Sequence, residues 1–199
     1  MIKGVIFDFG GVVGYGRKKN LHSIVADKVG VSEAVFQSFI DLYYDRSLKG
    51  LITRREFFTV IAKEFGFSTK EIEKKYEEAL KVQIRIRKPV IALAKKLRGK
   101  GYAIAMVSDV GTITAHYLHR NGVYSFFDPL ILSSEVKSVK PTRKIYELAL
   151  RKMNLKGKEC VFVDDHEYCL AGARRTGMNT VLFKDVKQLE RDLRALGVK

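Results

Sequence analysis

Three short hydrophobic runs, at residues 2–8, 102–107 and 160–164, constrain the fold of this chain more than any other feature. They are rich in β-branched and other apolar residues and lack regular polar alternation, which is typical of strands buried on both faces of a parallel sheet. In an open parallel sheet, ligands bind beyond the carboxyl ends of the strands. The sequence predicts that the polar residues closing these runs gather at one edge of a sheet: Asp8, Ser108, and Asp164 with Asp165.

The order of the expected elements gives the fold class. Further strands are expected at 129–132 and 179–183, and helical periodicity separates the strands. Strands that alternate with helices of ten to fifteen residues indicate βαβ units, so we expect an α/β fold with a doubly wound, Rossmann-like parallel sheet. The expected helices are 88–99, 141–153 with Pro141 at its start, 167–176 ending near Gly177, and 186–196.

Residues 15–87 interrupt this alternation, because they show one helical pattern after another. Ser32, Thr53 and Ser68 are typical N-cap residues, and the last two form capping-box patterns with a Glu three positions later. A helical insertion after the first strand of an α/β core indicates a small, all-helical cap domain. We therefore expect a cap domain at 15–87 and a core domain made of 1–14 and 88–199.

Composition limits the class of protein. The chain has 199 residues, of which 46% are hydrophobic, so it can form a real core. No apolar run approaches the ~20 residues of a membrane span. Met1 leads directly into the first expected strand, and we expect a cytoplasmic protein without a signal peptide or a membrane partner. Cys160 and Cys169 are too few for a metal-binding set, and no disulfide is expected.

The formal net charge is +15, which raises the question of a nucleic-acid partner. The basic residues are spread along the chain, and the longest basic run is only residues 17–19. Solvated helix faces explain this distribution better than a nucleic-acid site does, so a nucleic-acid partner is unlikely. A broad positive field would steer anionic substrates to the protein. Abundant charged side chains with few Gln and Asn also suggest a thermophilic origin.

The residue types at the expected sheet edge suit phosphate chemistry. Asp8 supplies a nucleophile or metal ligand, Ser108 supplies a hydroxyl for a phosphate oxygen, and Lys140 supplies a cation. Adjacent carboxylates such as those of Asp164 and Asp165 suit a divalent metal, and Mg²⁺ is the expected one because it takes few carboxylates. Residues 10–11 are both glycine, which lets the backbone turn sharply and approach a ligand.

These segments resemble the four motifs of the haloacid dehalogenase-like (HAD) hydrolase superfamily, in the order in which that superfamily uses them. Residues 5–13 look like the first motif, 106–109 the second, 133–141 the third, and 161–166 continuing to 178 the fourth. The resemblance covers the whole chain and is closest to the phosphatase-like branch that carries a helical cap after the first motif.

The resemblance implies a role for each residue. Asp8 would attack phosphorus and form an aspartyl-phosphate, Ser108 would bind a phosphate oxygen, and Lys140 would hold nucleophile and phosphate together. It implies a Mg²⁺-dependent phosphatase acting on a small phosphorylated metabolite. The implied metal ligands are Asp8, the Gly10 carbonyl, Asp164 and Asp165, and the implied substrate-binding residues are Gly10, Gly11, Ser108, Asp109 and Lys140.

Gly10 departs from the pattern, because the superfamily's usual second Asp stands two residues after the first and acts as a general acid and base. Loss of such help typically costs ~10²–10⁴-fold in rate. His166, beside the acidic pair, is one candidate substitute. A catalytically weak HAD fold that binds a protein or nucleic acid is one alternative, and a haloacid dehalogenase is another. The dehalogenase is disfavoured because it carries an aromatic residue in place of Gly10 and has no use for an acidic pair.

Several other residues have competing interpretations. Ser108 and Asp109 could together cap a helix beginning near Gly111, and Asp109 replaces an Asn common in the second motif. In the cap, aromatic side chains are expected in the core rather than around a substrate, and three histidines are expected on the surface or in helix packing. Two arginines are candidate substrate contacts. These cap and surface residues are Tyr43, Tyr44, Phe57, Phe58, His22, His116, His119, Arg17 and Arg46.

Overall fold

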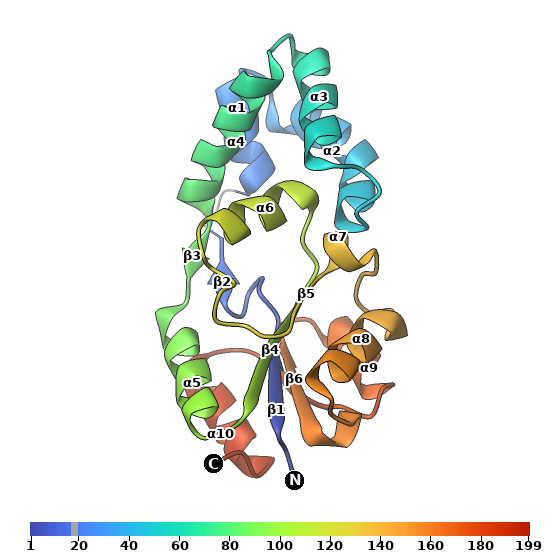
Figure 1. The fold of residues 1–199 in the computed structure, drawn as a ribbon. Coiled ribbons are helices and arrows are strands. Elements are labelled where there is room, and N and C mark those ends of the chain that lie inside the picture. The colour runs from blue at the N-terminus through green and yellow to red at the C-terminus, as the bar shows by residue number, and fades with distance from the viewer. Residues whose placement is uncertain (17–19) are drawn as a thin grey trace.

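The computed structural model describes residues 1–16 and 20–199. The described residues form a parallel five-stranded sheet in the order β5-β4-β1-β6-β7, which confirms the predicted α/β class (Figure 1). None of the described helices combines the length and hydropathy needed to cross a membrane. The strands are β1 (Gly4–Phe7), β4 (Ala103–Ser108), β5 (Leu130–Leu132), β6 (Cys160–Asp164) and β7 (Asn179–Leu182).

Helices cover both faces of this sheet, so the strands are buried on both sides. Figure 1 shows α5 and α10 on one side and α8 and α9 on the other. Side chains of β1 alternate accordingly: Val5 and Phe7 belong to the core under α5 and α10, and Ile6 belongs to the core under α8 and α9. The helices are α5 (Lys88–Gly99), α8 (Arg143–Met153), α9 (Glu167–Arg174) and α10 (Val186–Ala195), with the short α7 (Ser133–Val136) and the 3₁₀ turn η1 (Gly157–Glu159) between them.

The predicted elements match these closely, with one correction that concerns the site. Helix α8 does not begin at Pro141: its N-cap is Thr142, whose backbone is extended, and its first residue is Arg143. Pro141 therefore belongs to the loop that carries Lys140, not to the helix. Cys160 and Cys169 are both free and buried, and burial raises the pKa of each thiol to about 12, so both are neutral.

Between residues 20 and 83 the regular structure of the inserted segment is helical, as predicted, but the predicted all-helical segment 15–87 also contains short strand residues at its two ends, Tyr15 and Arg85–Ile86. Ser32, Thr53 and Ser68 are the observed N-caps, and the last two form complete capping boxes with Glu56 and Glu71. The helices share an apolar core that includes four buried aromatic side chains and lies apart from the two sheet cores. They are α1 (Leu21–Val29), α2 (Glu33–Leu48), α3 (Arg54–Phe65) and α4 (Thr69–Gln83).

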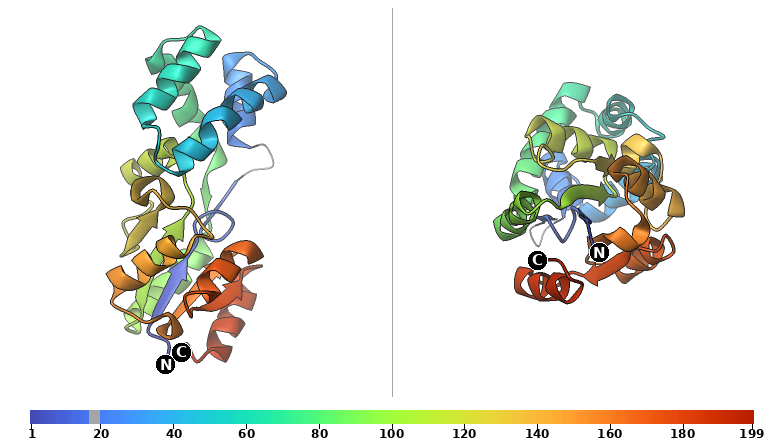
Figure 2. Two further views of the ribbon diagram at one scale, coloured as in Figure 1. Left: turned by 90° about the vertical axis from the view of Figure 1, so that its right-hand side faces the viewer. Right: turned by 60° about the horizontal axis from the view of Figure 1, so that its bottom comes forward.

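Two short antiparallel strands, β2 (Gly14–Tyr15) and β3 (Arg85–Ile86), join this helical part to the sheet. Just beyond β3, the guanidinium of Arg87 donates to the Val12 and Gly11 carbonyls at 3.0 and 3.1 Å. Figure 2 shows the helical part stacked on the carboxyl side of the sheet, away from both termini. The domain limits at residues 15 and 87 stay a prediction. Strand β2 ends at the first of these limits, and β3 ends one residue before the second.

Helix α6 (Thr112–Arg120) is a core element that contacts three cap helices, α2, α3 and α4, and the short core helix α7 also contacts α2. Its own N-cap, Gly111, offers no side chain. The hydroxyl of Ser47, at the end of α2, accepts a hydrogen bond from the Thr112 N–H at 3.1 Å instead. A Cβ at Gly111 would lie 2.7 Å from that hydroxyl, so the glycine makes room for it. A cap-domain side chain thus completes a core helix 65 residues away in sequence.

We predict that Ser47→Ala lowers the free energy of unfolding by about 1 kcal/mol, because it removes the N-cap acceptor of α6. Hydrogen exchange at the Thr112 amide should accelerate, and chemical denaturation should give the stability change. Ser38→Ala is the matched control, since Ser38 is an exposed serine of the same helix that bonds only within it. Equal effects of the two substitutions would contradict the capping role.

Candidate active site

The four motif segments converge at the carboxyl edge of the sheet. Strand pairing aligns Phe7 of β1 with Met106 of β4 and Val163 of β6, so the residues that follow them leave the sheet together. The Asp8 N–H donates to the Val163 carbonyl at 2.9 Å, which extends this pairing to the carboxylate itself. The register of β1 against β6 therefore places Asp8 next to the carboxyl end of β6, as the sequence predicted.

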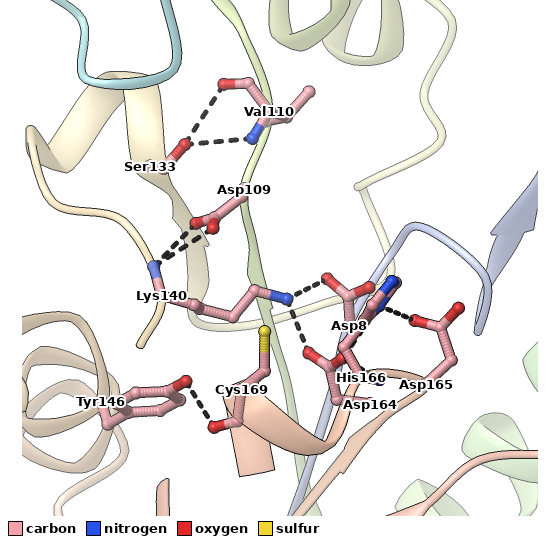
Figure 3. Close-up of polar contacts among 10 residues, drawn as sticks. All are labelled: Asp8, Asp109, Val110, Ser133, Lys140, Tyr146, Asp164, Asp165, His166 and Cys169. Carbon is pink, nitrogen blue, oxygen red and sulfur yellow. Dashed lines mark hydrogen bonds and ion pairs between the residues drawn. The ribbon is translucent and has the colours of Figure 1, made fainter. Parts of the chain in front are cut away.

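Lys140 joins two of these carboxylates (Figure 3). Its ammonium lies 2.8 Å from an oxygen of Asp8 and 2.6 Å from an oxygen of Asp164. The three side chains are nearly inaccessible to solvent, with exposures of 5%, 6% and 0% for Lys140, Asp8 and Asp164. Breaking a buried ion pair by removing one partner is costly, so this triad fixes the position of all three groups.

Burial and charge act in opposite directions on these groups. The pKa of Asp8 is raised to about 6: burial is the largest cause, the Lys140 ammonium opposes it, and the Asp164 carboxylate adds to it. Burial alone would lower the pKa of Lys140, but Asp8 and Asp164 together raise it above its usual range. Lys140 is therefore a fixed positive charge at neutral pH, beside an Asp8 carboxylate that is available as a nucleophile.

The acidic pair after β6 offers the donors for a divalent metal. One oxygen each of Asp164 and Asp165 and a ring nitrogen of His166 lie within 4.8 Å of one another. Carboxylate oxygens are the ligands that Mg²⁺ prefers, so the pair fits the predicted metal. His166 was not predicted as a ligand; its Nδ1 lies 2.8 Å from Asp165 and its ring is 58% exposed. Asp8 is outside this group, and the Lys140 ammonium lies between Asp8 and Asp164.

The two glycines after Asp8 have different roles. Gly11 has φ +74°, and a Cβ there would lie 1.9 Å from an Asp165 oxygen. Only glycine allows the β1 loop to lie against this carboxylate. Gly10 is exposed, and a Cβ there would meet only an Asp8 oxygen at 3.8 Å, an ordinary contact. The missing carboxylate at position 10 is therefore not a steric requirement of the loop.

Asp109 binds the chain beside Lys140. Both of its carboxylate oxygens accept from the Lys140 backbone N–H, at 3.0 and 3.2 Å (Figure 3). Ser133 similarly accepts from the Val110 N–H at 3.0 Å, which ties the second motif to the third. The alternative that Ser108 and Asp109 cap the following helix is wrong, because the side-chain cap of α6 comes from Ser47. The predicted substrate contact of Asp109 stays a prediction.

A cavity of about 490 Å³ opens between the cap and this edge of the sheet. Its core wall includes Gly10, Ser108 and Asp109, so it reaches the predicted phosphate site. The sequence did not identify the polar part of its cap wall, because nothing local marks those residues as neighbours. That part consists of Asn20, His22, Gln37, Asp41, Tyr44 and Ser47.

Other expectations for the cap have mixed outcomes. Phe57 and Phe58 are buried in the cap core, as predicted. Tyr44 is not a core residue, because it is 44% exposed and lines the cavity. The pKa of its hydroxyl is raised, first by partial burial and second by the Asp109 carboxylate. Arg46 is exposed and is absent from the described cavity lining. Arg17 lies outside the described residues.

A doubly wound parallel sheet, a helical insertion after its first strand, and a buried Asp–Lys–Asp triad at the strand ends together define a class of capped α/β hydrolases. The chain belongs to the haloacid dehalogenase-like hydrolase family, whose family model matches residues 2–177. The protein is thus a HAD-like hydrolase.

Individual similarities agree with this assignment. A HAD family enzyme from Bacteroides thetaiotaomicron, solved with magnesium and inorganic phosphate, has a TM-score of 0.78 and 25% identity over 95% of this chain and 99% of its own. Glyceraldehyde 3-phosphate phosphatase of Methanothermobacter thermautotrophicus is 35% identical over 48% of this chain and 44% of its own. Ribulose-1,5-bisphosphate 5-phosphatase of Halopiger xanaduensis is 33% identical over 45% of this chain and 38% of its own.

The chain spans less than half the length of each of these two curated relatives. Their substrates are therefore not assigned to it by similarity. The predicted cytoplasmic location and thermophilic origin stay predictions.

We predict that Asp109→Ala lowers the free energy of unfolding by about 1–3 kcal/mol, because it leaves the backbone N–H of the buried Lys140 without its side-chain acceptor. Asp109→Asn keeps one acceptor oxygen and should cost clearly less. Chemical denaturation of the metal-free protein measures both. If Asn is as damaging as Ala, hydrogen bonding to Lys140 is not what Asp109 contributes.

Proposed function

We propose that this protein is a Mg²⁺-dependent phosphatase that hydrolyses a small phosphorylated metabolite through an aspartyl-phosphate on Asp8. The observation that carries the proposal is the Lys140 ammonium held between Asp8 and Asp164 at the strand ends. A fixed cation beside a carboxylate nucleophile is what attack on an anionic phosphate requires, since two negative groups otherwise repel each other. The phosphatase names of both curated relatives support the same reaction class.

The first step transfers the phosphoryl group to the protein. An Asp8 oxygen attacks phosphorus and forms a new P–O bond while the ester P–O bond breaks. The leaving oxygen keeps the electron pair of the broken bond and takes a proton from water, because Gly10 has no side chain to donate one. In the second step, water attacks the same phosphorus and loses a proton to solvent, the bond between phosphorus and the Asp8 oxygen breaks, and inorganic phosphate leaves. The Asp8 carboxylate keeps the electron pair of that bond and is restored.

The surrounding groups hold the phosphoryl oxygens. Ser108 lines the cavity beside Gly10 and would donate its hydroxyl to one oxygen. The Lys140 ammonium would stay close to both the nucleophile and the phosphate throughout the reaction and balance their negative charge. Asp8, the Gly10 carbonyl, Asp164 and Asp165 would hold Mg²⁺, which supplies charge neutralisation at the phosphoryl oxygens when bound. Gly10 and Gly11 would bring backbone groups close to the phosphate.

Asp8→Asn tests the nucleophile. We predict a loss of activity on the order of 10³-fold or more, because the Asn amide has nearly the shape of the carboxylate but cannot form the acyl phosphate. Phosphate release from p-nitrophenyl phosphate with magnesium measures it. Asp45→Asn removes an exposed α2 carboxylate whose ion pair is with Lys49, the C-cap residue of the same helix, and it should leave activity unchanged. Equal activity of native protein and Asp8→Asn would reject the covalent route.

Gly10→Asp tests the missing acid. We predict that native protein hydrolyses aryl phosphates far faster than alkyl phosphates, because no residue at position 10 protonates the leaving oxygen. Gly10→Asp should raise alkyl phosphate turnover by about 10²-fold or more. The space around Gly10 admits the first side-chain atom without a clash.

Gly10→Asn is the matched control, since it fills the same space without a transferable proton and should give no gain. A native rate that does not depend on the leaving group would show that another group donates the proton. A protein that binds but does not hydrolyse phosphates, with no gain in Gly10→Asp, would favour the alternative of a HAD fold used for binding.

A further inference from the structure

The cavity between cap and core contains hydrogen-bonded side chains that the phosphoryl chemistry does not use. It is enclosed partly by α2, whose Gln37 and Asp41 face it one helical turn apart, and by His22 of α1. Asp8 itself is not part of the described lining, but Gly10 and Ser108, which are expected at the phosphate, are; a substrate whose phosphate lies at Asp8 would therefore extend into this space. The inference below rests on the proposed phosphatase function.

The three side chains form a relay whose direction is fixed by chemistry. The Gln37 amide nitrogen lies 2.6 Å from an Asp41 oxygen, and a carboxylate can only accept, so Gln37 donates there. The Gln37 oxygen therefore faces His22, whose Nδ1 lies 3.2 Å away and must be the donor. In a neutral imidazole the other nitrogen then carries no proton. His22 consequently offers Nε2 as a hydrogen-bond acceptor.

The neutral state of His22 follows from its surroundings. Burial lowers the pKa of His22, while the hydrogen bond to Gln37 and the Asp41 carboxylate oppose this effect. The net direction is downward, so the ring is uncharged at neutral pH. Among the described residues, no hydrogen bond to its Nε2 is present, whereas the edges of the ring pack against Tyr44 and Phe36.

The charged side chains of the described cavity lining are carboxylates. Asp41 lies on the cap wall and Asp109 on the core wall, and the described lining contains no Lys or Arg. One Asp41 oxygen accepts from Gln37, and the residue is exposed. None of the three relay residues is a lysine or an arginine, so no cation within the relay neutralises the Asp41 carboxylate. A second anionic group on a substrate would be repelled here, whereas hydroxyl groups find acceptors at Asp41 and at His22.

We propose that the His22–Gln37–Asp41 relay selects phosphate monoesters whose leaving group carries hydroxyls and no second anion. Asp41 repels a carboxylate or second phosphate, and the relay presents acceptors to hydroxyl donors. Gln37 acts as a positioning residue, because it holds Asp41 and fixes the tautomer of His22 without itself needing to contact the substrate.

Two substrate pairs isolate this selection. Glycerol 3-phosphate and 3-phosphoglycerate differ only in a hydroxymethyl group against a carboxylate, and both release a primary alkoxide. Fructose 6-phosphate and fructose 1,6-bisphosphate differ in a hydroxyl against a second phosphate. We expect native protein with magnesium to prefer the less charged member of each pair by about 10-fold or more in kcat/KM, since removing one close charge repulsion is worth about this factor.

Asp41→Asn should reduce that preference about 5- to 20-fold, chiefly by raising kcat/KM for the anionic member. Asp41→Lys should reverse it. Asp45→Asn is the matched control. Asp45 lies one turn further along α2 and is absent from the described cavity lining, so removing its charge should not change the preference. Neither Asp41 nor Asp45 is buried, so the variants should fold, and circular dichroism melting checks this.

The outcomes separate the two proposals. If native protein hydrolyses p-nitrophenyl phosphate but treats both members of each pair equally, or prefers the anionic ones, the selection by Asp41 is rejected and the phosphatase proposal stands. If the preference exists but is unchanged in Asp41→Asn, the relay is not its origin. If neither p-nitrophenyl phosphate nor any of the four metabolites is hydrolysed with magnesium, the phosphatase proposal fails and this inference fails with it.

Discussion

The buried contact of Lys140 with Asp8 and Asp164 is the interaction on which the rest of the site depends. It joins three segments that are far apart in sequence, and each charge is acceptable in this dry environment only because the others are present. The loop carrying Lys140 is in turn held by Asp109, and the β1 loop lies against Asp165 at Gly11. The phosphate chemistry proposed for this edge of the sheet would therefore rest on one preorganised cluster of charges.

The cap takes part in this arrangement through specific contacts with the core. Ser47 of α2 completes the N-terminus of α6, and α6 is a core helix that packs against α2, α3 and α4 of the cap. The same helix α2 carries Gln37 and Asp41 into the cavity. The helix that carries the proposed selecting side chains is thus tied to the core by the hydrogen bond between Thr112 and Ser47.

Much of the fold was predictable because its signals are local. The alternation of apolar strands with helices, and the N-caps at Ser32, Thr53 and Ser68, depend on residues a few positions apart. The error at Pro141 has a local cause as well, since proline is common at a first helical position, but here Thr142 is the extended residue that caps α8. Tyr44 was misplaced because an aromatic side chain on a helix gives no sign of whether it faces a core or a cavity.

The sequence by itself determined the α/β class, the helical insertion, and the order of Asp8, Ser108, Lys140 and the acidic pair, because strand ends and residue types follow from short-range patterns. Only the tertiary structure decided that Lys140 lies between Asp8 and Asp164, that Ser47 caps α6, and that His22, Gln37 and Asp41 form one relay. Several of these contacts join residues separated by tens of positions or more. Such contacts exist only once helices and strands have packed, and no periodicity in the chain encodes the distance between two side chains that packing brings together.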